Sequence, residues 1–291
     1  MSRDTREERR ARRRARREER RMAGDQIGVA ALIPNLFTTM NLAAGFYSIV
    51  LSGSGHYERA AVALIFAAVF DILDGRLARM AGATSRFGFE YDSIADTVSF
   101  GVAPAMLAFH AGKFTELGWT GWVLGFMFTA GAALRLARFN VTPQRYPGRF
   151  EGLPSPAAAG MVVATVLFVG FLREAGLYVS VPALLPAFGL AALGLLMVSP
   201  IPYHSGKEVR LHRPQTAAVI TVFAAAVVLL KPGLTLFPLG VAYVLSGPIA
   251  WLRRRRRGTT LETLAEASAR AESATASQAD DAHPGPPHSL H

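Results

Sequence analysis

The sequence predicts an all-α polytopic membrane protein with about eight transmembrane helices. Hydrophobic residues make up 51% of the 291 residues, a larger share than an ordinary soluble domain needs. They fall into blocks of roughly 17–24 residues, the length with which a helix crosses the hydrocarbon core of a bilayer. The basic residues are concentrated outside these blocks, where they can face water or lipid headgroups.

The apolar blocks predict the following helices in chain order: 36–53, 60–80, 93–111, 118–137, 156–173, 181–199, 215–231 and 234–252. The third block is the weakest by hydropathy, because it contains Asp96 and several Ser, Thr and Gly residues. The first block follows a charged segment without a signal-peptide cleavage pattern, so we expect it to remain in the membrane as a span.

Basic residues favour one side of the predicted bundle. The connections on that side hold two or three each, namely Arg79 and Arg86, then Arg138, Arg145 and Arg149, then Lys207, Arg210 and Arg213. The connections on the other side hold one each. The positive-inside rule places the first set in the cytoplasm, and an even number of spans places both termini there. We therefore expect an integral protein of a prokaryotic cytoplasmic membrane, with its active site on the cytoplasmic side.

Composition divides the chain into a basic cytoplasmic N-terminal segment, a transmembrane core, two additional transmembrane helices with a basic end, and a disordered tail: 1–31, 32–200, 201–257 and 258–291. The basic ends suit anionic lipid headgroups. A membrane-anchored nucleic-acid binder would depend on these ends alone, so we expect no nucleic-acid partner. The absence of cysteine excludes disulfides and thiolate metal sites.

Two pairs of aspartates flank the first basic connection. Asp71 and Asp74 are three residues apart and Asp92 and Asp96 are four apart, so each pair shares one helix face. A single such residue near a helix end is usually a cap or is solvated. Four close together would repel one another unless they were neutralised, and two divalent cations would balance them. All-oxygen ligation favours Mg²⁺ or Mn²⁺ over zinc, so we predict a two-ion site.

A transporter that binds its cation at these aspartates is an alternative from another functional class, because carboxylates within a membrane usually have a function. Two features disfavour it. All four aspartates lie toward one membrane face, and the sequence shows no inverted repeat.

Residues 71–96 fit the spacing D-x-x-D-G-x-x-A-R, eight residues, then G-x-x-x-D-x-x-x-D, without departure at any defined position. This pattern resembles the signature of the CDP-alcohol phosphotransferases. The resemblance implies a six-helix core in which Asp71, Asp74 and Asp92 hold one metal ion. It also implies that Asp71, Asp92 and Asp96 surround the second ion, and that Asp96 is the catalytic base on the acceptor alcohol.

The resemblance further implies a binding site for the CDP group made by Asn35, Thr38, Asp74, Gly75, Ala78, Arg79 and Ser85. These residue types suit a phosphate ligand, because glycine permits close approach and the Arg79 guanidinium can donate two parallel hydrogen bonds. Alternatively, Gly75 and Ala78 form a small-residue helix contact and Arg79 is a cytoplasmic anchor.

Three other stretches, IPNLFTTMNLAAGF, RLARFN and GLPSPAAAG, resemble the phosphatidylserine synthases of that family. The implied reaction converts CDP-diacylglycerol and L-serine into phosphatidylserine and CMP, and the implied assembly is a homodimer. Arg135, Arg138 and Asn140 could bind the carboxylate of serine. The two arginines could instead be membrane anchors, or could bind the phosphate of an inositol phosphate or glycerol phosphate acceptor in a sibling synthase.

Overall fold

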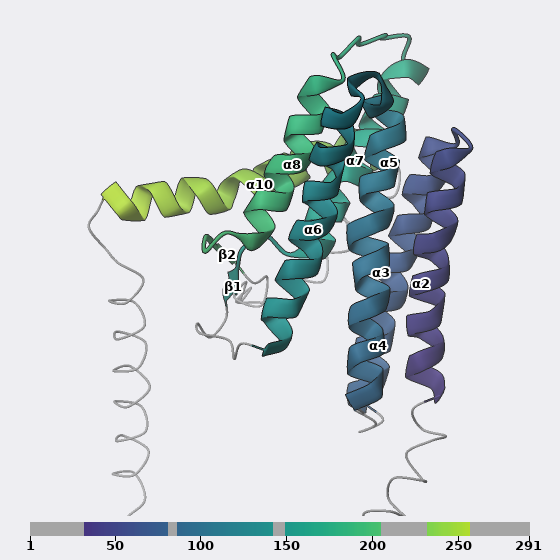
Figure 1. The fold of residues 1–291 in the computed structure, drawn as a ribbon, viewed down its shortest axis with the longest axis vertical. Helices are drawn as coiled ribbons and strands as arrows, with labels where there is room; N and C mark the ends of the chain where they lie inside the picture. The colour runs from purple at the N-terminus through teal and green to yellow at the C-terminus, as the bar shows by residue number, and fades with distance from the viewer. Residues whose placement is uncertain (1–31, 81–85, 142–148, 205–231, 257–291) are drawn as a thin grey trace, which may run out of the picture.

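The computed structural model describes residues 32–80, 86–141, 149–204 and 232–256. Most of its helices run side by side along the long axis of the molecule (Figure 1). Length and apolar composition identify five candidate spans among the described helices: Asn35–Gly53, Phe87–Ala111, Trp119–Val141, Ser155–Glu174 and Gly233–Arg253. The predicted all-α polytopic membrane fold is thereby confirmed.

The first two helices form an antiparallel hairpin. Helix α2 spans Leu32–Gly53 and α3 spans Tyr57–Met80. The connection turns at Gly55, whose φ of 80° suits glycine best. Ser48 of α2 donates a 2.9 Å hydrogen bond to the carbonyl of the fully buried Ala60. The hairpin therefore places the end of α3, with its aspartates, beside the beginning of α2.

The third predicted span is one continuous helical segment with a π-helical centre. It consists of α4 (Arg86–Asp96), the π-helix η1 (Thr97–Val102) and α5 (Ala103–Ala111), and so begins earlier than the predicted residue 93. A Cβ atom on Gly45 of α2 would overlap the Ser99 hydroxyl of η1. The glycine therefore lets α2 pack directly against the π-helix that follows Asp96.

The next helices form the other half of the bundle. The 3₁₀ turn η2 (Phe114–Leu117) leads into α6 (Trp119–Val141), followed by α7 (Ser155–Glu174) and α8 (Leu184–Val198). A Cβ atom on Gly194 of α8 would lie 2.6 Å from the Met127 carbonyl oxygen, so α6 and α8 pack with their backbones in close contact.

Helix α8 has 15 residues and is shorter than the predicted span 181–199. Pro186 explains why the helix begins later than predicted. Pro186 lies in the first turn, where the missing N–H of proline costs nothing, whereas a longer helix would place it in the interior.

A two-stranded antiparallel ribbon, which the sequence did not predict, connects distant parts of the chain. Strand β1 (Arg149–Glu151) pairs with β2 (Pro202–His204), and Phe150 lies opposite Tyr203. Strand β1 precedes α7 in the chain and strand β2 follows α8, so the ribbon joins the start of α7 to the end of α8.

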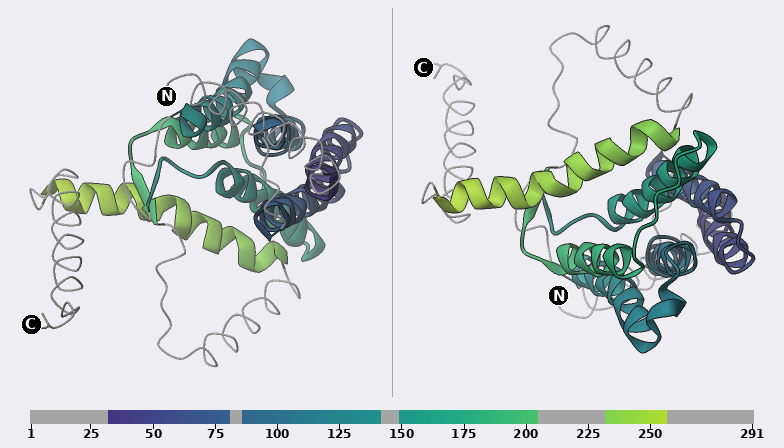
Figure 2. Two further views of the ribbon diagram at one scale, coloured as in Figure 1. Left: turned by 90° about the horizontal axis from the view of Figure 1, so that it is seen from below. Right: turned by 90° about the horizontal axis from the view of Figure 1, so that it is seen from above.

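Helix α10 (Pro232–Arg256) does not run parallel to the other helices. Seen along the axis of the bundle, most of the helices appear nearly end-on whereas α10 lies along its length (Figure 2). The predicted span 234–252 is therefore helical, but it crosses the bundle steeply. The predicted span 215–231, Ser85 and the two terminal segments lie outside the described residues.

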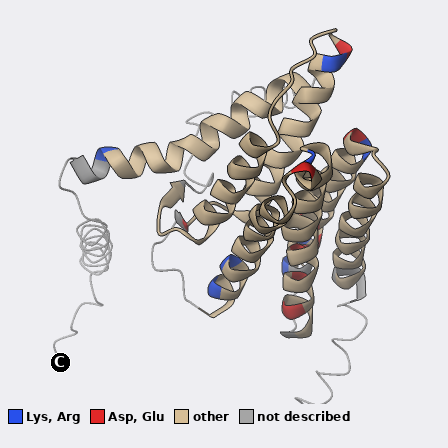
Figure 3. Ribbon diagram, turned by 45° about the horizontal axis from the view of Figure 1, so that its top comes forward, with Lys and Arg blue, Asp and Glu red and all other residues tan. Residues whose placement is uncertain are grey.

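The surface of the described part suits a lipid environment. Large apolar side chains are exposed, among them Phe46, Phe66 and Trp119, and charged residues interrupt only short parts of the helices (Figure 3). Trp119, Trp122 and Phe126 stack in succession near the start of α6, as aromatic residues do at a membrane interface.

Candidate active site

The structure brings three of the four aspartates together. Asp71 and Asp74 lie on α3 and Asp92 lies on α4, and one carboxylate oxygen from each is within 4.8 Å of the others. The three-residue spacing puts the first two carboxylates on one face of α3. The antiparallel course of α4 then brings the third against that face.

Asp96 lies one helical turn beyond Asp92 and beside Asp71, within hydrogen-bonding range of it. The Asn41 side-chain amide of α2 donates a 3.1 Å hydrogen bond to Asp96 Oδ1. Asn41 is fully buried, and its backbone carbonyl accepts a 3.0 Å hydrogen bond from the Ser99 hydroxyl of η1. Asn41 therefore contacts the chain on both sides of the junction between α4 and η1, and it orients the Asp96 carboxylate.

Helix α2 also supports the aspartates of α3. The Thr38 hydroxyl donates a 2.9 Å hydrogen bond to Asp74 Oδ2, and both residues are buried. The hydroxyls of the next residue, Thr39, and of Tyr91 on α4 form a 2.9 Å hydrogen bond. Residues 38–41 thus contact both helices that supply carboxylates.

The aspartate cluster has the donor set of a hard divalent cation. Ligand oxygens on opposite sides of an octahedral Mg²⁺ lie about 4.2 Å apart, which is comparable with the spacing of these carboxylates. Within the described residues, no Lys or Arg forms an ion pair with the four aspartates, and the buried Asp92 Oδ1 has no hydrogen-bond partner. Divalent ions would satisfy this oxygen and neutralise the cluster, so the residues fit the predicted metals.

The residues predicted to bind CDP lie around the same end of α2 and α3. A Cβ atom added to Gly75 would lie 3.7 Å from Arg79 Nη1, so the guanidinium folds back over Gly75. Arg79 is itself exposed, and Asn35 is half-buried in the first part of α2. Ala78 lies on α3 between Gly75 and Arg79.

The predicted acceptor arginines are held by a different part of the molecule. Arg138 of α6 donates from Nη1 to the Val198 carbonyl at 3.2 Å and from Nη2 to the Glu151 carbonyl at 3.4 Å. Arg135 Nη1 lies 3.5 Å from the buried Ser155 hydroxyl at the start of α7. The buried Arg135 Nε has no hydrogen-bond partner within the described part of the chain, so a donor remains for a ligand.

Asn140 connects the arginine stretch to the aspartates. Its side-chain amide donates a 2.9 Å hydrogen bond to the Ser93 hydroxyl of α4. Ser93 directly follows Asp92 in the chain. The end of α6 is therefore attached to the helix that carries two of the four carboxylates.

Comparison with known proteins gives the same family as the motif. The CDP-alcohol phosphatidyltransferase family matches residues 31–192, which include every aspartate and arginine of the site. The chain belongs to this family.

The similar proteins extend the comparison over most of the chain. A CDP-diacylglycerol–serine O-phosphatidyltransferase of Helicobacter pylori is 36% identical over 226 residues, covering 76% of this chain and 91% of that protein. One of Mycobacterium leprae is 37% identical over 232 residues, covering 75% and 74%. An archaetidylserine synthase of Methanothermobacter thermautotrophicus is 35% identical over 173 residues, covering 59% and 69%.

Membership in the CDP-alcohol phosphatidyltransferase family decides between the two functional classes that the sequence pattern left open. The chain is an enzyme of this class rather than a cation transporter. Asn41 and Ser155 are two site residues that sequence reasoning did not select. The only signal for Asn41 was its place on one face of α2 with Asn35 and Thr38, and nothing local marked Ser155 as a partner of an arginine.

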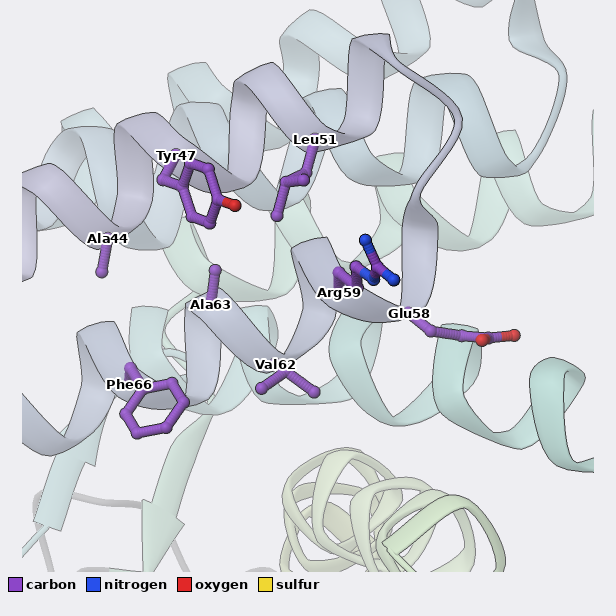
Figure 4. A pocket seen from close by; sticks show the side chains of 8 residues that line it. All are labelled: Ala44, Tyr47, Leu51, Glu58, Arg59, Val62, Ala63 and Phe66. Carbon is purple, nitrogen blue, oxygen red and sulfur yellow. The ribbon is translucent and has the colours of Figure 1, made fainter.

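A lipid-facing groove of about 540 Å³ lies between α2 and α3, away from the aspartates (Figure 4). Its lining is mostly apolar: Ala44, Tyr47, Leu51, Glu58, Arg59, Val62, Ala63 and Phe66. Glu58 points away from the groove, toward Gly170 of α7. The groove contains none of the aspartates or the predicted acceptor residues.

Proposed function

We propose that this enzyme transfers the phosphatidyl group of CDP-diacylglycerol to L-serine, giving phosphatidylserine and CMP. The observation that carries the proposal is the convergence of Asp71, Asp74 and Asp92 from two helices. The names of the relatives supply the substrates, since those of Helicobacter pylori and Mycobacterium leprae are named for CDP-diacylglycerol and serine.

Two Mg²⁺ or Mn²⁺ ions held by Asp71, Asp74, Asp92 and Asp96 would neutralise the diphosphate and stabilise the charge that develops on CMP. The contact between Thr38 and Asp74 supports this assignment, because it fixes the direction of one ligand carboxylate. The CDP group would lie along Asn35, Thr38, Asp74, Gly75, Ala78, Arg79 and Ser85. The folded-back Arg79 guanidinium would then face the phosphates over Gly75.

Asp96 is proposed as the base. The Asn41 amide donates to Oδ1 and so orients the carboxylate that would accept the proton of the serine hydroxyl. The serine oxygen then forms a bond to the phosphorus that carries diacylglycerol. The bond between that phosphorus and the CMP oxygen breaks, and CMP leaves with the electron pair. A carboxylate is a weak base, so its contribution depends mainly on its position.

Arg135, Arg138 and Asn140 are proposed to bind the carboxylate of serine. Supporting evidence comes from Arg135 Nε, which has no hydrogen-bond partner among the residues that the structure describes, and from the hydrogen bond that joins Asn140 to the aspartate helix. A sibling reaction with an inositol phosphate or glycerol phosphate would use the same arginines for a phosphate. Only the acceptor distinguishes the two reactions.

We further propose that the site faces the cytoplasm, as the loop charges indicate, and that the membrane is a prokaryotic one, like those of the Helicobacter pylori and Mycobacterium leprae relatives. We also propose that the enzyme is a homodimer, as the family resemblance implies. Residues 32–200 are proposed as the catalytic core and 201–257 as an addition to it. Cysteines introduced at the exposed residues Ser54 and Phe139 should react with impermeant reagents only from opposite sides of the membrane.

The proposal is tested by an acceptor panel with purified protein in detergent, CDP-diacylglycerol and Mn²⁺ or Mg²⁺. CMP release should require L-serine, and the lipid product should be phosphatidylserine. Release with inositol 1-phosphate or glycerol 3-phosphate but not with serine would refute the serine assignment and support the sibling reaction.

A further inference from the structure

Helix α10 carries three glycines at intervals of seven residues, Gly233, Gly240 and Gly247. Seven residues make almost two turns of an α-helix, so the three glycines lie on one face. The matched family region ends at residue 192, and all three lie beyond it. Neither the aspartate motif nor the acceptor stretch gives them a role.

Each glycine is in close contact with another element. A Cβ atom on Gly233 would lie 2.6 Å from the Leu167 carbonyl oxygen of α7, and one on Gly240 would lie 2.8 Å from the Met161 sulfur. A Cβ atom on Gly247 would collide with the ring of Tyr203 in β2. The glycine face therefore packs α10 closely against α7 and, at Gly247, against strand β2 of the ribbon.

Tyr203 fastens α10 to the ribbon. Its side chain is 1% exposed, and its hydroxyl donates a 3.0 Å hydrogen bond to the Val244 carbonyl of α10. The rings of Tyr203 and Tyr243 lie 5.7 Å apart. Phe150 on strand β1 lies opposite Tyr203 in the register of the ribbon.

The ribbon in turn holds the groups that contact the two arginines. The carbonyl of Glu151, the last residue of β1, accepts a hydrogen bond from Arg138. Gly152 donates a 2.9 Å backbone hydrogen bond to Ile201, which fixes the entry into α7 and hence Ser155, the partner of Arg135.

We propose that α10 positions the acceptor site through the contact of Gly247 with Tyr203 of the ribbon. The inference rests on the proposed function, because it takes Arg135 and Arg138 to bind serine. It makes Gly247 and Tyr203 positioning residues that determine affinity for the acceptor. We do not expect them to affect the aspartates or the CDP site on α2, α3 and α4.

The test compares Gly247→Leu with Gly189→Leu. Gly189 lies on the exposed face of α8, and a Cβ atom there would meet nothing within 4 Å, so it is a matched control for the same substitution. We expect Gly247→Leu to raise the KM for serine about tenfold, the effect of weakening one charge-assisted contact. The KM for CDP-diacylglycerol should stay within about twofold of wild type, and Gly189→Leu should change neither constant.

Tyr203→Phe provides a second variant in case Gly247→Leu does not fold. It keeps the ring and removes only the hydrogen bond to Val244, so the KM for serine should rise about threefold, again without a change for CDP-diacylglycerol. Thermal stability in detergent is measured for every variant.

Equal changes in both KM values, or a loss of stability with unchanged KM values, would overturn the inference, since a merely structural helix would behave in this way. The wild-type enzyme is assayed first. If its CMP release does not depend on serine, the proposed function itself fails. If the wild type does depend on serine but the Gly247 and Tyr203 variants have its KM for serine, only the inference about α10 fails.

Discussion

The aspartates and the arginines lie in the same bundle but are held by different kinds of contact. The aspartates are positioned mainly by side chains: Thr38 donates to Asp74 and Asn41 donates to Asp96. Arg138 instead donates to the backbone carbonyls of Val198 and Glu151, which are 60 and 13 residues away in the chain.

This difference predicts different responses to substitution. In the aspartate region, the charge and the donor set carry the function, so removing one carboxylate should be severe. In the arginine region, the backbone of the ribbon and of α8 defines the geometry, so even a substitution that keeps the charge should have an effect. Asn140 joins the two regions through Ser93.

The largest effect is expected at the aspartates. Asp71→Asn, Asp74→Asn or Asp92→Asn should each lower kcat by at least about a thousandfold, because each removes a charged ligand worth several kcal/mol of charge stabilisation. EDTA should inactivate the wild type reversibly. Glu116→Gln, which removes an exposed carboxylate in η2, is the control. Full turnover by metal-free enzyme would contradict the two-metal proposal.

A smaller loss is expected when the support of Asp96 is removed. Asn41→Leu deletes the donor to Asp96 Oδ1 while keeping the number and branching of the side-chain heavy atoms. A hydrogen bond to a charged group is worth about 1.5–3 kcal/mol. At saturating substrates kcat should fall about ten- to a hundredfold. Because Asn41 is fully buried, thermal stability in detergent is measured alongside. If the folded variant has the kcat of the wild type, Asn41 does not support Asp96 in catalysis.

The smallest effect is expected at the link between the regions. Ser93→Ala removes the acceptor of the 2.9 Å hydrogen bond from Asn140, a neutral contact worth about 1 kcal/mol. We expect kcat/KM for serine to fall about fivefold. Ser54→Ala, at an exposed position in the turn after α2, should show no change. A loss as large as that of the aspartate variants would mean that Ser93 itself contacts a substrate.

The aspartate region could be predicted from the sequence because its information is local. Helical periodicity puts Asp71 and Asp74 on one face of α3, and a short connection brings Asp92 to them. Hydropathy likewise located the candidate spans, since blocks long enough to cross a bilayer are rare in soluble chains.

The arginine region could not be predicted in the same detail. Every residue has a backbone carbonyl, so nothing in the sequence marks Val198 or Glu151 as the partner of Arg138. The three-residue strands of the ribbon are too short for a periodic signal. The contact of Gly247 in α10 with Tyr203 in β2 joins segments 44 residues apart, and no local pattern marks it.

The crossed dependence of the two substrates tests the division of the site most directly. Arg79→Lys and Arg138→Lys both keep the charge but lose the planar fork of the guanidinium. The KM for serine and the KM for CDP-diacylglycerol are measured for each variant. Arg138→Lys should raise the KM for serine about tenfold with little change for CDP-diacylglycerol, and Arg79→Lys should do the reverse. If Arg79 governed serine and Arg138 governed the CDP-lipid, the account would be contradicted.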